Sequence, residues 1–137
     1  MSNYVLVILA SLLLSGCGET EEKIEDIEKS RTEDAGTVSS DERYEFEITG
    51  SRNVYRLEDK IEEVVITGDE NYITVVSDAM IDTLIITGDR NVVDTEDGHD
   101  TTIVDVEIDG VNNFVKLYDV ANLTSTSSSN LVIQTSE

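Results

Sequence analysis

The chain has 137 residues, of which 30 are acidic and 9 basic, so its formal net charge is -21. Such a surface repels nucleic-acid phosphates and anionic lipid headgroups, which excludes both as expected partners of the folded surface. Cationic partners and divalent ions remain compatible with it. One cysteine permits no intramolecular disulfide. With no tryptophan and only two phenylalanines, the core must consist mainly of valine, isoleucine and leucine, a composition that favours β-sheet.

The first 16 residues contain no charged side chain. The apolar run from Tyr4 to Leu14 is shorter than the about 20 residues of a membrane-spanning helix and suits the core of a signal peptide. It is followed by Leu14-Ser15-Gly16-Cys17, which resembles the lipobox of bacterial lipoproteins, although no lysine or arginine precedes the apolar run. The resemblance implies that residues 1–16 are removed as a signal peptide and that acyl chains on Cys17 hold the protein to a membrane.

The resemblance also bears on location in the cell envelope. Gly18 stands where inner-membrane lipoproteins carry a retaining aspartate. This implies the outer membrane in a host with two membranes, and the outer face of the plasma membrane otherwise.

The segment after Cys17 is dense in charge. Glu19 to Glu42 holds ten acidic and three basic residues. Its few apolar side chains bury too little surface to offset the entropy of ordering the chain. We therefore expect residues 17–42 to form an acylated cysteine followed by an acidic, disordered tether, and residues 43–137 to form the folded domain.

The remainder of the chain repeats one phrase, an apolar strand followed by I-x-G-x-x-N and another strand. Its glycines are 18, 20 and 22 residues apart, and Ser129 to Ile133 begins a fifth copy. Such a period is typical of stacked repeats. The glycine is expected to adopt a backbone angle that other residues avoid, and the asparagine to bond to its counterpart in the next copy. The repeat residues are Gly50, Asn53, Gly68, Asn71, Gly88, Asn91, Gly110 and Asn113.

Apolar residues alternate with other residues on both sides of the phrase, with the period of two that characterises strands. Phe46, Val64, Leu84 and Val106 form one inward set, and the isoleucines of the phrase form another. We therefore predict an all-β fold, a short parallel β-solenoid of about four to five coils. The repeat resembles that of small bacterial envelope proteins of unknown function, a resemblance that implies no activity. An antiparallel β-sandwich or meander remains the alternative.

The phrase places Val54, Tyr72, Val92 and Phe114 at outward positions of successive copies. A continuous apolar stripe on an acidic surface suggests a contact site, either for a protein partner or for self-association. The alternative explanation is that the tether or a loop folds over the stripe, or that another sheet buries this face.

Few residues suggest chemistry. Asp69 and Asp89 follow equivalent glycines, so stacking brings like charges together, screened either by Arg52 and Arg90 or by weakly bound Ca²⁺. The only histidine lies in an acidic loop that could ligate a divalent cation or be a solvated loop. The candidate ligands there are Asp94, Glu96, Asp97, His99 and Asp100.

No motif indicates an enzyme or a resident cofactor. The sequence thus predicts a membrane-anchored envelope lipoprotein that displays a small acidic β-repeat module with a structural or interaction role. A divalent-cation-binding protein, or a carbohydrate-active protein, is the alternative function.

Overall fold

The computed structural model describes residues 25–96, 101–118 and 120–135. Residues 1–16, which we expect to be a signal peptide, Cys17 and the loop residues Asp97, His99 and Asp100 lie outside the described residues. Twelve strands occupy the described chain: β1 (Glu25–Lys29), β2 (Ala35–Val38), β3 (Tyr44–Ile48), β4 (Val54–Leu57), β5 (Lys60–Ile66), β6 (Tyr72–Val75), β7 (Met80–Ile86), β8 (Val92–Thr95), β9 (Thr102–Ile108), β10 (Phe114–Tyr118), β11 (Val120–Ser125) and β12 (Leu131–Thr135).

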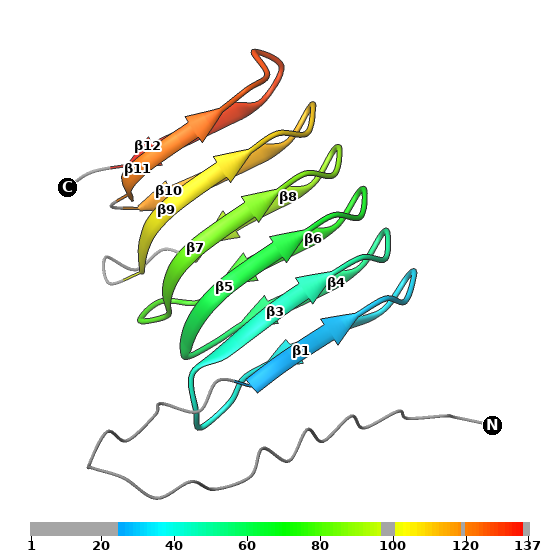
Figure 1. Cartoon of the computed structure of the whole chain (residues 1–137), viewed down its shortest axis with the longest axis vertical. Helices are drawn as coiled ribbons and strands as arrows, with labels where there is room; N and C mark the ends of the chain where they lie inside the picture. The colour runs from blue at the N-terminus through cyan, green and yellow to red at the C-terminus, as the bar shows by residue number, and fades with distance from the viewer. Residues whose placement is uncertain (1–24, 97–100, 119, 136–137) are drawn as a thin grey trace, which may run out of the picture.

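The strands form two parallel sheets that the chain visits in turn. The odd-numbered strands make one sheet, in the order β1-β3-β5-β7-β9-β11, and the even-numbered strands make the other, in the order β12-β10-β8-β6-β4-β2. We call them the odd sheet and the even sheet. Each odd strand passes through a short corner into the following even strand, and the corners line up along one side of the molecule (Figure 1). The four corners between β3 and β10 carry the I-x-G-x-x-N phrase. The predicted parallel β-solenoid is confirmed, with about five complete turns, and the antiparallel alternative is wrong.

The core lies between the two sheets and consists of the inward residues of each strand. The isoleucine of the phrase stacks in register from Ile48 through Ile66 and Ile86 to Ile108, and all four are buried. The even strands β6 and β8 contribute Ile73 and Val93, which pair with each other in register and are both fully buried. Because each side chain rests on its counterpart one coil away, the β-branched residues pack as continuous columns.

The glycine of each repeat copy is required for a reason other than the expected positive φ. None of the four repeat glycines has a positive φ. A Cβ added to Gly68 would lie 1.8 Å from the carbonyl oxygen of Gly50, and one added to Gly88 would lie 2.0 Å from that of Gly68. The glycine therefore permits close stacking of successive corners. The left-handed conformation falls two residues later, on Arg52, Glu70, Arg90 and Asn112.

The repeat asparagines form the predicted ladder. Each of Asn53, Asn71, Asn91 and Asn113 is buried. The Asn71 Oδ1 accepts hydrogen bonds from the backbone N–H of Asn53 at 3.0 Å and from its Nδ2 at 3.1 Å. The Asn71 Nδ2 donates to the Gly50 carbonyl at 3.0 Å and to the Asn91 Oδ1 at 3.1 Å. One amide thus satisfies backbone groups that the tight corner leaves without other partners.

The predicted disordered tether is wrong for residues 25–42. Strands β1 and β2 form an additional coil beneath the first recognised copy, with Lys29 paired to Ile48 and Ala35 paired to Val54. In this coil Lys29, Arg31 and Asp34 occupy the places of the isoleucine, glycine and asparagine. The backbone spacing is preserved while the side chains are charged, so composition alone suggested a disordered segment.

Candidate functional site

The predicted apolar stripe is a column on the outer face of the even sheet. Val54 pairs with Tyr72, Tyr72 with Val92, and Val92 with Phe114, and Leu131 continues the column onto β12. The exposed fractions are 51% for Val54, 41% for Tyr72 and 55% for Leu131, whereas Val92 and Phe114 are half-buried. We call these five residues the apolar column. It is open to solvent at three of its five positions, so the described part of the chain does not cover it.

Charged groups that flank the apolar column are paired with one another. Arg56 forms a two-pronged contact with the carboxylate of Glu96 and also bonds to Glu58, with 3.1 Å between its Nε and the Glu58 Oε1. These hydrogen bonds raise the pKa of the Arg56 guanidinium, and the bond to Glu96 has the larger effect. Lys116 Nζ lies 3.5 Å from Asp94 Oδ1. Two cationic side chains thus face three carboxylates on this flank, so its net charge is small although the chain as a whole is strongly acidic.

Asp69 and Asp89 stack at the corner as expected, but neither of the two proposed kinds of screening is needed to explain them. The Asp69 Oδ1 accepts a hydrogen bond from the backbone N–H of Asp89 at 2.8 Å, and the Asp89 Oδ1 accepts one from Val111 at 2.9 Å. Arg90 pairs with Glu70, and Arg52 with Glu33. The arginines thus neutralise glutamates, while each aspartate bonds to the next turn of backbone.

The acidic loop is only partly described. Asp94 lies on β8 and Glu96 follows the strand, where these two carboxylates pair with Lys116 and Arg56. Across residues 25–96, 101–118 and 120–135, no three histidine, cysteine or acidic side chains come together as metal ligands would. Both described members of the predicted cation site therefore have cationic protein partners.

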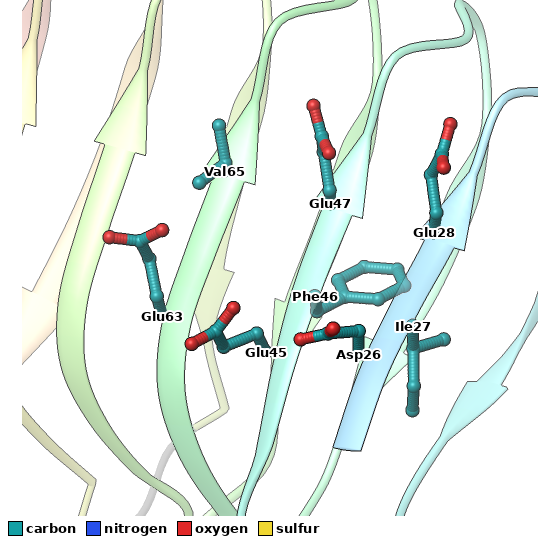
Figure 2. A pocket seen from close by; sticks show the side chains of 8 residues that line it. All are labelled: Asp26, Ile27, Glu28, Glu45, Phe46, Glu47, Glu63 and Val65. Carbon is teal, nitrogen blue, oxygen red and sulfur yellow. The ribbon is translucent and has the colours of Figure 1, made fainter. Parts of the chain in front are cut away.

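A second feature, which the sequence did not reveal, lies on the outer face of the odd sheet near its amino-terminal end. A hollow of about 320 Å³ lies over β1, β3 and β5, and its apolar lining residues are Ile27, Phe46 and Val65. Figure 2 shows the carboxylates of Asp26, Glu45 and Glu63 side by side across three strands, with Glu28 and Glu47 further along. We call these five carboxylates the acidic hollow.

The register explains the acidic hollow. Asp26 pairs with Glu45, and Glu45 with Glu63, so like charges stand on adjacent strands. Burial, and then a hydrogen bond with Asp26 and repulsion from it, raise the pKa of the Glu45 carboxyl above its ordinary value. The alternating Glu45 and Glu47 before Gly50, and the adjacent Glu62 and Glu63 before Gly68, were visible in the sequence. The alignment of Asp26 with them was not, because the first coil lacks the repeat phrase.

Comparison with known proteins does not assign the chain to a family: no family model, no curated protein and no solved structure matches it. None of the residues that the structure describes belongs to an apolar helix of membrane-crossing length. Function must therefore be inferred from the two faces of the solenoid and from the sequence.

Proposed function

We propose that the chain is a membrane-anchored envelope lipoprotein whose solenoid is a non-enzymatic interaction module, and that a protein partner binds the apolar column. The single observation that carries the proposal is the in-register exposure of Val54, Tyr72 and Leu131 on one face. Burying three exposed apolar side chains on binding would contribute roughly 1.5–3 kcal/mol each, before the costs of association.

The flanking charges support an apolar partner surface. Because Arg56 and Lys116 are already paired with protein carboxylates, they do not attract a strongly anionic ligand to this face. A partner with a complementary apolar surface and few charges fits the column best. Aromatic residues at its centre, Tyr72 and Phe114, are the residue types that most often dominate binding energy at such contacts.

The docking proposal is tested by site-specific photo-crosslinking in the protein's own cells. A crosslinker at Tyr72 should capture a discrete partner, and the combined Tyr72→Ser and Phe114→Ser substitutions should abolish the capture made from position 54. Met80 is a matched control, because it is 44% exposed but lies on the odd sheet. Equal capture from Met80 and Tyr72 would refute a role for the apolar column.

The anchoring proposal rests on Leu14-Ser15-Gly16-Cys17 and has its own test. Metabolic labelling with an alkyne fatty acid should label the protein, and Cys17→Ala should remove the label and release the protein from the membrane fraction. A wild-type chain that stays unlabelled and still begins at Met1 would contradict lipoprotein processing without affecting the docking test.

A further inference from the structure

The two ends of the solenoid differ sharply in charge. Seven of the 14 residues from Glu25 to Val38, the first strand pair, are charged. None of the 16 residues from Val120 to Thr135, the last strand pair, is charged. In a chain with a net charge of -21, a whole neutral coil marks the one described end where two copies can approach with the least repulsion.

The last coil also presents open strand edges. Strands β11 and β12 are the outermost strands of their sheets in the described chain, and each pairs there with one neighbour only. Leu123 pairs with Val106, which is 3% exposed, yet Leu123 itself is 44% exposed because none of the described strands pairs with the outer edge of β11. An edge of β-branched and polar residues without charge or proline is the type of edge that accepts another strand.

At the opposite end, the edge of the odd sheet is protected against the same pairing. On β1, Glu25 and Lys29 pair with Tyr44 and Ile48, which are both buried core residues. Charged side chains at inward positions of an edge strand make a further strand costly, since the charge would lose its water. Stacking the last coil of one copy on the first coil of another would bury these charges. Head-to-tail filaments are therefore disfavoured.

We propose that the last coil, residues 120–135, is a self-association surface, and that its occupant is the last coil of a second copy of this chain. A two-fold axis relates the two ends, so β11 and β12 meet strands of the second copy in antiparallel pairs and Leu123 is covered. Such a dimer adds no further copies, because its two free ends are the β1 ends, which are protected against strand pairing. It is separate from the apolar column of the even sheet, apart from Leu131, which lies on both.

Sedimentation velocity tests the proposal on the full chain carrying Cys17→Ser, in a mild non-ionic detergent that disperses the apolar run from Tyr4 to Leu14. A monomer–dimer equilibrium is expected, with no larger species. The dimer should tighten as salt is added, because salt screens the repulsion between two acidic copies. A chain that stays monomeric across the micromolar range at high salt would overturn the proposal.

A matched pair of substitutions locates the contact. Leu123→Lys places on β11 the type of charge that protects β1 and should weaken the dimer about a hundredfold, the effect of an unpaired charge buried at an interface. Met80→Lys makes the same change at equal exposure, 44%, on an inner strand of the same sheet and should leave the dimer unchanged. Equal loss in the two variants would refute the location.

Hydrogen exchange provides a second measurement on the unmodified edge. Amides of β11 and β12 should exchange more slowly at high than at low protein concentration, while those of β1 should be unaffected. Concentration-dependent protection on β4 and β6 instead would show that the apolar column joins the copies, and would overturn the proposal.

Discussion

Replacing one interior asparagine of the ladder tests the energetic logic of the fold. Asn71→Ala removes the acceptor of the Asn53 backbone N–H and the donor to the Gly50 carbonyl. Both groups are buried in the stacked corners, and a buried backbone group without a partner costs about 1–3 kcal/mol. The free energy of unfolding should therefore fall by about 2–6 kcal/mol, a large part of the roughly 5–15 kcal/mol typical of a domain.

The assay is urea denaturation followed by far-ultraviolet circular dichroism, at low protein concentration so that association does not contribute. Asn122→Ala is the control, because Asn122 is exposed and bonds to the side chain of Asp105 at 2.6 Å. It should change stability by no more than about 0.5 kcal/mol. If Asn71→Ala cost no more than Asn122→Ala, the ladder would be incidental and the stacking of apolar columns alone would hold the coils together.

Three further outcomes follow from the same geometry. Gly68→Ala should destabilise by about 3 kcal/mol or more in thermal denaturation, because its Cβ would overlap a carbonyl oxygen, whereas Gly36→Ala, with nothing within 4 Å, should be near neutral. Glu45→Gln should stabilise at pH 7 by roughly 0.2–1 kcal/mol. Because the raised pKa of Glu45 makes its ionised form unfavourable in the fold, stability should rise as pH falls through that pKa, and the variant should reduce this rise. Ultraviolet titration should show Tyr55 ionising near pH 12, since burial, and then its hydrogen bond to a carboxylate, raise the pKa from 10.0 to about 12; stability should accordingly decrease as pH rises from 10 toward 12. A Tyr55 that titrates near pH 10 in the folded protein would contradict its burial between the sheets.

The repeat phrase favoured the correct stacking direction and register over the antiparallel alternative. Isoleucine, glycine and asparagine recur at fixed spacing, and parallel stacking is the arrangement that brings all three into register at once. It predicted the apolar column for the same reason, since outward positions follow from inward ones. The resulting pairing of Tyr72 with Val92 and of Val92 with Phe114 is present in the structure.

Prediction of the fold from the sequence failed where charged residues occupy repeat positions. Lys29 and Asp34 replace isoleucine and asparagine at the end of the stack, where one side of the coil faces solvent and charge is tolerated. Composition could not distinguish such a coil from a disordered tether. The acidic hollow was missed with it, because Asp26 supplies one of its carboxylates.

The glycine was assigned the wrong role because sequence alone does not separate conformational need from steric need. The left-handed residues at the corner, Arg52, Glu70 and Arg90, are not the types that usually mark a positive φ. Pairing of Arg52 with Glu33 and of Arg90 with Glu70 across successive corners was also not evident, since the arginines were expected to screen the aspartates.

In-register pairing makes the body of this protein modular in length. Strand contacts run between adjacent coils, and an interior corner bonds to the corners on both sides, as Asn71 does to Gly50 and to Asn91. Excising one period, residues 69–88, would join Gly68 to Asp89 and restore I-T-G-D-R-N at the junction. Tandem duplication or loss of about 20 codons would therefore change how far the molecule reaches while leaving its cross-section the same.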